Sequence, residues 1–261
     1  MTLPDLPDAF AWTQTPLGLV VKCQPLEAIA PHLFTTRNVP ISSPDEWEAV
    51  AALIGATGAV TLNQVHGREV VTIRGGSALP EGRPDADALV SNDQRMAIAV
   101  RAADCVPLLL ADRRTGAVAA VHTGWRGTAA GVAVAAIEAM SRDFGVHPQH
   151  LVAAIGPSIG PCCYEVGSEL VDAFAAAGHP RHFIDRWFAI RSKGAGVRGK
   201  AAGILVLDLP GANRDQLVLA GVPEDQVFLS GLCTAMHLDV LTSYRAEKAS
   251  ATRIAGVIRA R

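Results

Sequence analysis

A cysteine and a histidine flank two apolar runs in "RAADCVPLLLADRRTGAVAAVHTGWRG", residues 101–127. If the polar "DRRTG" segment closes an antiparallel hairpin, the pairing places Cys105 opposite His122 or Thr123. Directly opposed residues hold their Cβ atoms roughly 5 Å apart, and a tetrahedral metal with bonds of about 2.0 to 2.3 Å bridges donors at that separation. The pair therefore favours a metal site, although each residue alone is more often a packed cysteine or a hydrogen-bonded histidine.

A metal needs a third donor, and His66 in "NQVHG" is the best candidate by residue type. Two β-rich runs surround His66 and Gly67, so we expect a tight hairpin there with His66 at a strand end. Two histidines and one cysteine leave one coordination position free, which is typical of catalytic zinc. A metal-free alternative uses Cys105 as a thiolate nucleophile with His122 as its base.

The segment "HTGWRG" adds a candidate anion site. We expect a strand to end at His122 and a helix to begin near Thr128, which points the free N–H groups of the first helical turn beside the metal. Arg126 adds a guanidinium suited to phosphate or carboxylate. The alternative is a capped helix with an exposed Arg126 and a packed Trp125.

Length and composition limit the classes of protein that can hold such a site. The chain has 261 residues, of which 49% are hydrophobic and 18% charged, and this is enough for a sizeable core. The net charge of −2 gives no field that attracts nucleic acid or an anionic membrane, so we expect neither as a partner. "MTLPDLPDAFAW" lacks a basic start and an apolar run, and five cysteines suit a reducing compartment. We expect a cytoplasmic protein; the sequence predicts no oligomeric state.

The adjacent cysteines of "GPCCYE", Cys162 and Cys163, are a second group of thiols. Adjacent side chains on an extended backbone point in opposite directions, so we do not expect this pair to bind zinc. We expect packing beside Tyr164 instead. The segment also lacks the P-C-x-x-C spacing of the zinc nucleobase deaminases.

Hydrophobic periodicity predicts the elements that position these residues. Helices are expected from Pro44 to about Ile54, with Ser43 and Glu46 as a capping box, and over 128–145, 168–178 and 212–221. Buried strands are expected at "MAIAV", "VPLLLA", "AVAAV", "HLVAAIG" and "QVFLS". Strands outnumber helices without strict alternation, which predicts an α+β fold in a single domain over residues 1–261.

Seven segments occur in the order and approximate spacing of the laccase-domain family, also called the peptidoglycan editing factor family: "NQVHG", "PDADALVSN", "AADCVPLLLAD", "VHTGWRGTAAG", "AIGPSIGPCCYEVG", "CTAM" and "SYR". The chain resembles this family from about Phe34 to Val257. The resemblance implies mixed β-sheets packed together and flanked by helices. It also implies a zinc-dependent purine nucleoside enzyme that phosphorolyses adenosine, inosine and S-methyl-5′-thioadenosine and deaminates adenosine, with purine nucleosides and phosphate as its partners.

By motif, the resemblance makes His66, Cys105 and His122 catalytic metal ligands, with Zn²⁺ as the expected ion and Cu²⁺ as the alternative. Arg37 and Arg126 would be catalytic residues that hold phosphate, together with the backbone after Gly127. Arg37 stands in "FTTRNVPIS", which lacks both glycines of the family's early motif, so the loop that presents it can differ in shape.

Zinc would lower the pKa of a bound water for attack on C6 of adenosine, whereas phosphate would attack the sugar. Asp104 and Glu165 are the carboxylates nearest the motifs and are candidate proton carriers. A copper polyphenol oxidase is one alternative, although eight histidines without an H-x-H pair do not fit a trinuclear copper cluster. Two others are a peptidoglycan-precursor hydrolase with Cys105 as nucleophile and a non-enzymatic, metal-stabilised binding protein.

Overall fold

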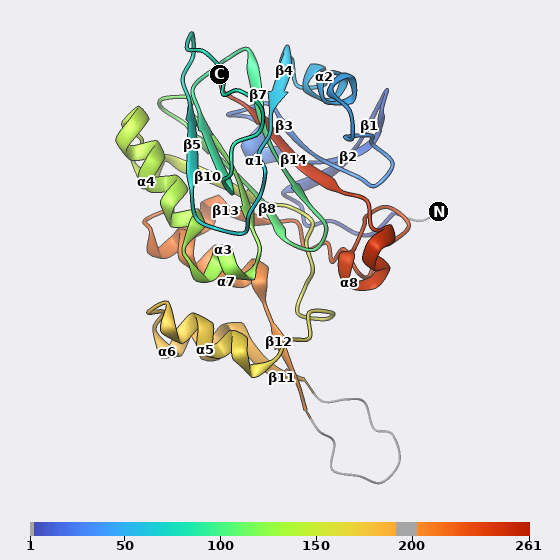
Figure 1. The fold of residues 1–261 in the computed structure, drawn as a ribbon, viewed down its shortest axis with the longest axis vertical. Coiled ribbons are helices and arrows are strands. Elements are labelled where there is room, and N and C mark those ends of the chain that lie inside the picture. Colours follow the sequence, from blue (N-terminus) through green and yellow to red (C-terminus); the bar gives the residue numbers. More distant parts are fainter. Residues whose placement is uncertain (1–2, 192–202) are drawn as a thin grey trace.

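Two six-stranded sheets pack face to face in the computed structural model, which describes residues 3–191 and 203–261 (Figure 1). In spatial order the first sheet contains β1 (Phe10–Thr15), β2 (Gly18–Cys23), β3 (His32–Thr35), β14 (Ile254–Arg259), β7 (Met96–Ala102) and β4 (Gly58–Val60). The second contains β13 (Val227–Leu229), β10 (Leu151–Ile155), β8 (Val106–Asp112), β9 (Val118–Thr123), β6 (Ala88–Ser91) and β5 (Val70–Ile73). A separate two-stranded sheet pairs β11 (Phe188–Arg191) with β12 (Ile204–Leu207).

Helices cover the outer faces of both sheets. The longest in the described part of the chain, α4 (Val132–Phe144), packs on β5, β6 and β9 of the second sheet, and α2 (Pro44–Ala52) packs against β4 of the first (Figure 1). The other helices are α1 (Gln24–Glu27), α3 (Trp125–Ala129), α5 (Ser168–Ala176), α6 (Arg181–Trp187), α7 (Leu209–Leu219) and α8 (Tyr244–Glu247). Short 3₁₀ turns lie at Pro148–His150, Glu224–Gln226 and Lys248–Ser250.

Apolar side chains fill three layers because each sheet is covered on both faces. In β7, Ile98 belongs to the core between the sheets, which also contains Leu109 of the second sheet. Its neighbour Ala99 belongs to the core under α2, as the two-residue period of a strand requires. Burial on both faces explains why the strands have continuous apolar sequences, and it confirms that "MAIAV", "VPLLLA" and "AVAAV" are buried strands.

The predicted α+β fold of mixed sheets flanked by helices is confirmed, and so is the capping box of α2. Ser43 Oγ accepts a hydrogen bond from the Glu46 N–H, and the Glu46 carboxylate accepts one from the Ser43 N–H at 2.9 Å. The single helix predicted over 128–145 is wrong. Gly131 has φ +76°, a left-handed conformation that separates α3 from α4.

The hairpin predicted around His66 and Gly67 is also wrong. The flanking strands belong to different sheets, since β4 pairs with β7 of the first sheet and β5 pairs with β6 of the second. Residues 61–69 therefore cross from one sheet to the other. Residues 103–105, between β7 and β8, make a second crossing of this kind.

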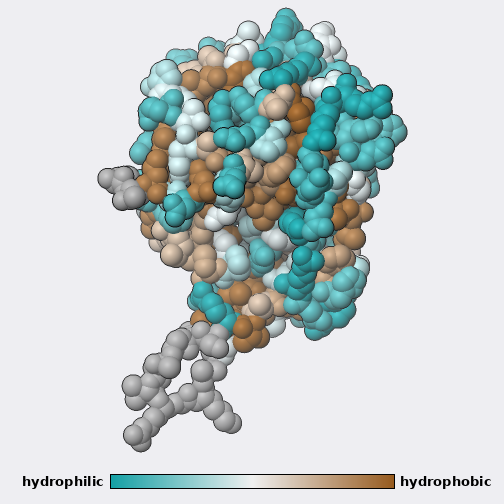
Figure 2. All heavy atoms as spheres, turned by 180° about the vertical axis from the view of Figure 1, so that it is seen from behind, coloured by the Kyte–Doolittle hydropathy of each residue, from teal (hydrophilic) through white to brown (hydrophobic). Residues whose placement is uncertain are grey.

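No helix in the described part of the chain has the length and apolar character needed to cross a membrane. Seen from behind, the surface carries hydrophobic residues near its middle and a hydrophilic strip beside them (Figure 2). This face therefore mixes both kinds of residue.

Candidate metal centre

The β8–β9 hairpin places Cys105 and His122 close together, with a register that differs from the predicted one. Pro107, not Cys105, pairs with His122. The turn is longer than expected, since Ala111 and Val118 are the last paired residues. Within the turn, the Asp112 carboxylate accepts hydrogen bonds from the N–H and hydroxyl of Thr115, at 2.9 and 2.6 Å. Cys105 directly precedes β8 and lies diagonally across from His122, two residues from its partner Pro107.

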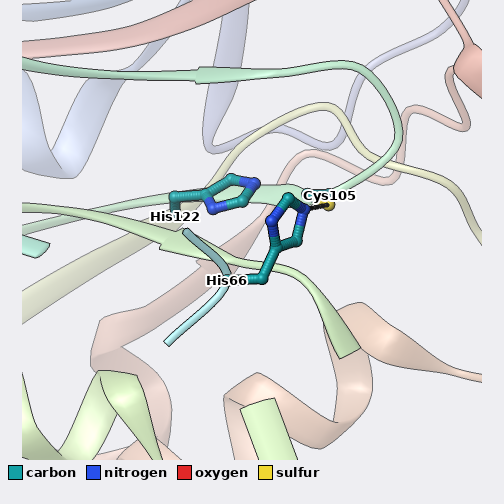
Figure 3. A group of neighbouring side chains, drawn as sticks. All are labelled: His66, Cys105 and His122. Carbon is teal, nitrogen blue, oxygen red and sulfur yellow. Dashed lines mark hydrogen bonds between the residues drawn. The ribbon is translucent and has the colours of Figure 1, made fainter. Parts of the chain in front are cut away.

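The structure brings the side chains of His66, Cys105 and His122 to one place (Figure 3). Their ligand atoms all lie within 4.8 Å of one another. The Cys105 sulfur is 4.0 Å from His66 Nε2, and the two imidazole rings are 4.9 Å apart at an angle of 82°. Each residue comes from a different segment: the β4–β5 connection, the β7–β8 connection and the end of β9.

The loop that carries His66 is held by the polar residues of the segments around it. The Gln64 amide donates to the Arg101 carbonyl at 2.7 Å and accepts from the Arg101 N–H at 2.8 Å. The Asp87 carboxylate accepts from the Gly67 N–H at 2.6 Å. These bonds support His66 at φ +61°, a left-handed conformation that is uncommon for a residue with a side chain.

Asp87 also fixes the second histidine. Its Oδ1 lies 2.8 Å from His122 Nδ1, and its backbone carbonyl accepts from the His122 N–H at 2.7 Å. Because Nδ1 donates to the carboxylate, Nε2 is left to face the other two ligands. Burial alone would raise the pKa of Asp87, but the bonds from His122 and Gly67 lower it below its usual value.

Asp87 is the site residue that the sequence reasoning missed. It stands in the motif "PDADALVSN", where an acidic residue comes directly before the buried strand β6. An acid at a strand end close to candidate ligands was the available signal.

The electrostatics of the metal-free site favour a thiolate. Burial would raise the pKa of Cys105, but hydrogen bonds from His122 and His66 lower it to about 6. Burial would lower the pKa of His122, whereas its bonds to Asp87 and Cys105 raise it to about 9. A thiolate is the form of cysteine that binds a metal.

Gly124 leaves the space that the ligands occupy. A Cβ atom at this position would lie 3.0 Å from the Cys105 sulfur and 3.0 Å from His66 Cδ2. Its φ of −73° is ordinary, so the close approach explains the glycine. In the described residues the group contains three donors and no fourth His, Cys, Asp or Glu. The set fits a metal with one open position.

A cavity of about 490 Å³ opens over the three ligands. Four cationic side chains and two tyrosines are among its lining residues: Arg101, Arg245, Lys248, Arg253, Tyr164 and Tyr244. Burial and the nearby guanidinium groups of Arg83 and Arg253 lower the pKa of Arg101, which shows that positive charge is concentrated here. No local pattern in the sequence predicts these cations, because β7 and the last 20 residues meet only in the fold.

The arginines expected to hold phosphate lie outside the lining of this cavity. Arg37 forms an ion pair with Glu247 at 2.9 Å and donates to the carbonyl of Leu238. The guanidinium of Arg126 lies 4.4 Å from the centre of the Trp125 ring and is exposed.

The predicted helix start near Thr128 is wrong, since α3 begins at Trp125. Gly127 is buried, and a Cβ there would lie 3.1 Å from the Gly67 carbonyl. This glycine therefore allows α3 to approach the His66 loop.

The two candidate proton carriers occupy different surroundings. Asp104 lines the cavity, but its carboxylate already accepts hydrogen bonds from the Thr234 hydroxyl at 2.6 Å and the Arg245 N–H at 2.5 Å. Glu165 is outside the lining and lies 3.5 Å from Arg191.

Comparison with known proteins gives the family. The model of the multi-copper polyphenol oxidoreductase laccase family matches residues 32–261. A purine nucleoside phosphorylase from Deinococcus radiodurans is 34% identical over 248 residues, which are 87% of this chain and 88% of that protein. Adenosine deaminase RL5 from an unknown prokaryotic organism is 43% identical over 148 residues, 57% of this chain and about half, 52%, of its own length.

A solved structure extends the similarity to the fold. The crystal structure of YlmD from Geobacillus stearothermophilus superposes with a TM-score of 0.78 at 26% identity, covering 98% of this chain and 100% of that one. The chain therefore belongs to the family of enzymes that the multi-copper polyphenol oxidoreductase laccase model describes.

Proposed function

We propose that this chain is a zinc-dependent purine nucleoside enzyme of the cytoplasm. It phosphorolyses adenosine, inosine and S-methyl-5′-thioadenosine to the free base and ribose 1-phosphate, or its methylthio form, and it deaminates adenosine. The observation that carries the proposal is the group of three potential metal ligands, His66, Cys105 and His122, at the base of a cavity lined by four cationic side chains. The names of the relatives, purine nucleoside phosphorylase and adenosine deaminase, support the two reactions.

The cations of the cavity supply the phosphate site in this proposal. Arg101 and Arg253 are close enough for their charges to interact, and such a pair is stabilised by an anion between them. As the glycosidic bond breaks, positive charge develops on the sugar, and phosphate held by these guanidinium groups stabilises it. Arg245 and Lys248 line the same cavity from the C-terminal part of the chain.

Arg37 and Arg126 become candidate residues at the edge of this site. Arg37 acts through its ion pair with Glu247, which holds the segment that carries Arg245. The charge of Arg126 lowers the pKa of Tyr164, although burial, the largest effect, raises that pKa to about 12 overall. Tyr164 therefore stays protonated at neutral pH and offers a hydrogen-bond donor to the substrate.

Residues at the base of the cavity position the side chains that would bind the ion. Asp87 holds the His122 ring, Gln64 anchors the His66 loop, and Gly124 leaves room for the ligand atoms. When bound, zinc supplies Lewis-acid activation of water, which serves deamination at C6.

The test is a nucleoside panel with metal-defined protein, in the presence and absence of phosphate, with free base and ammonia measured. We expect base release to require phosphate and ammonia release to occur without it. His122→Ala should abolish both, whereas Arg74→Ala, in a surface ion pair with Asp143, should leave both unchanged. Turnover of a phenol by copper-loaded protein, without activity on nucleosides, would favour the polyphenol oxidase instead.

The thiolate of Cys105 supports a second candidate, a metal-free hydrolase of peptidoglycan precursors in which Cys105 is the nucleophile. The observation that favours it is the position of the Cys105 sulfur within 4.8 Å of a ring nitrogen of His122, the expected base, and of His66. If the chelated protein still hydrolysed a peptidoglycan precursor at full rate, and alkylation of Cys105 abolished this hydrolysis, the mechanism would be established. Loss of activity on chelation and recovery with Zn²⁺ would exclude it.

A further inference from the structure

A second group of sulfur atoms lies outside the described centre. The Sγ atoms of Cys162, Cys163 and Cys233 are all within 4.8 Å of one another. Bonds of about 2.3 Å around a tetrahedral cation put sulfur ligands roughly 3.8 Å apart, so small side-chain adjustments suffice to surround one ion. We propose that these three cysteines bind a thiophilic cation of the Zn²⁺ or Cu⁺ class, at a site separate from His66, Cys105 and His122.

The turn after β10 makes this arrangement possible. The Gly160 carbonyl accepts hydrogen bonds from the N–H groups of both Cys163 and Tyr164, each at 3.0 Å. The backbone of Cys162 and Cys163 is therefore curled into a turn, and the expectation that their thiols point in opposite directions, which assumed an extended backbone, is wrong.

Cys233 is brought to this turn by a strand-like contact between distant segments. Ser158 and Cys233 form an isolated parallel bridge, with the Ser158 N–H donating to the Leu232 carbonyl and the Thr234 N–H donating to the Ser158 carbonyl. The Gly160 N–H lies 3.3 Å from the Cys233 sulfur and donates to it. This bond holds the Cys233 sulfur beside the turn that carries Cys162 and Cys163.

Access and donor type favour a soft cation. Cys233 is buried, Cys163 is half-buried and Cys162 is exposed, so an ion can enter from solvent and reach the buried sulfur. The group contains sulfur donors alone among the described residues, in contrast to the mixed nitrogen and sulfur set of the first centre. Thiolate ligands select Zn²⁺ and Cu⁺ over hard cations such as Mg²⁺ and Ca²⁺.

A positive charge lies beside the three cysteines, and a hydrogen bond connects their surroundings to the first centre. Arg191 donates to the Cys162 carbonyl, and its charge offsets part of the negative charge of three thiolates. Thr234, next to Cys233, donates to Asp104, which lines the cavity over the first centre.

The test uses the full chain, freed of metal by chelation, with Cd²⁺ as a thiophilic probe that gives sulfur-to-metal charge-transfer absorption. The Cys105→Ser variant serves as background, because it removes the only thiol of the first centre. In this background we expect one Cd²⁺ per chain with strong absorption, and Zn²⁺ should displace it. Adding Cys162→Ser should abolish the absorption, whereas Cys23→Ala, which removes a buried thiol of β2, should preserve it.

The Cys233→Ser variant removes the buried ligand and should also abolish the absorption; circular dichroism before titration checks that this variant is folded. Absorption that survives Cys162→Ser, or that disappears with Cys105→Ser alone, would overturn the proposal. Mass analysis under non-reducing conditions provides a further check. A disulfide between two of the three cysteines in freshly purified protein would show that the group is a redox pair and not a metal site.

Discussion

The buried carboxylate of Asp87 lies 2.8 Å from His122 Nδ1, and this contact decides which ring nitrogen faces the candidate metal centre. Asp87→Asn should therefore weaken zinc binding about 10- to 100-fold, because an amide that donates to Nδ1 leaves the proton on Nε2. Competition with a chelator of known affinity measures the effect. Asp143→Asn, at a surface cluster of ion pairs, is the control, and equal affinities in the two variants would contradict the role of Asp87.

Gly124→Ala should disturb the ligands without unfolding the protein. The new Cβ would lie 3.0 Å from the Cys105 sulfur and from His66 Cδ2, while the backbone at φ −73° accepts alanine. We expect a melting temperature of the metal-free protein close to wild type and zinc affinity at least about tenfold lower. Gly58→Ala, whose Cβ would meet only the flexible Met96 side chain, is the matched control. Wild-type zinc affinity in Gly124→Ala would show that the ligands adjust freely.

Arg101→Ala should separate the two proposed reactions. Loss of one charge-assisted hydrogen bond costs about 1.5 to 3 kcal/mol, which corresponds to a rise in the KM for phosphate of about 10- to 100-fold. Deamination of adenosine needs no phosphate and should change much less. Steady-state assays of adenine and ammonia release measure both. If Arg126→Ala raises the KM for phosphate and Arg101→Ala does not, phosphate is bound at the start of α3 and not by the cavity cations.

Gly156→Ala should destabilise the core between the sheets. A Cβ atom there would lie 2.4 Å from the Phe34 ring, and such overpacking costs about 1 to 3 kcal/mol of unfolding free energy. Urea denaturation measures this difference. In a Phe34→Leu background, the same substitution should cost less because the ring is gone. Equal costs in both backgrounds would mean that the strain is not at Phe34.

Glu27 links stability to acid pH. Partial burial would raise its pKa, but hydrogen bonds from His32 and Lys22 outweigh this effect and hold the pKa at about 2, below the value of 4.5 for a free side chain. The resulting stabilisation is present above about pH 4.5 and disappears as the pH falls toward about 2. Glu27→Gln should therefore lower the melting temperature near neutral pH and have little effect at the acid end. Glu48→Gln, at an exposed position of α2, should show no such pH-dependent difference.

The strands and α2 could be predicted because their signals are local. Continuous apolar runs and the Ser43–Glu46 capping box depend on neighbours in the sequence. The path of the chain between the sheets was not predictable in this way. The β-rich runs around His66 resemble a hairpin, yet β4 pairs with β7 and β5 pairs with β6, in different sheets. Bonds made by Gln64 and Asp87 hold the loop between them.

In the candidate site, too, the residues with local sequence signals are predictable and those that depend on long-range packing are not. Residue type and motif predict His66, Cys105 and His122, and the fold brings them together. The prediction for Cys162 and Cys163 is wrong because their backbone forms a turn and is not extended. The cavity cations are not predictable from local sequence because their common location depends on long-range packing.

The two chain connections that carry His66 and Cys105 both leave one sheet and enter the other. An ion held there would act as a cross-link at one end of the sandwich and oppose sliding of the sheets. A ligand that binds only the folded state, at a free concentration of 100 times its Kd, adds about 2.7 kcal/mol to the unfolding free energy. Amide protons of the β4–β5 connection would exchange more slowly with the ion bound. With the ion bound, the two sheets would therefore separate first at the end of the sandwich opposite the candidate metal centre.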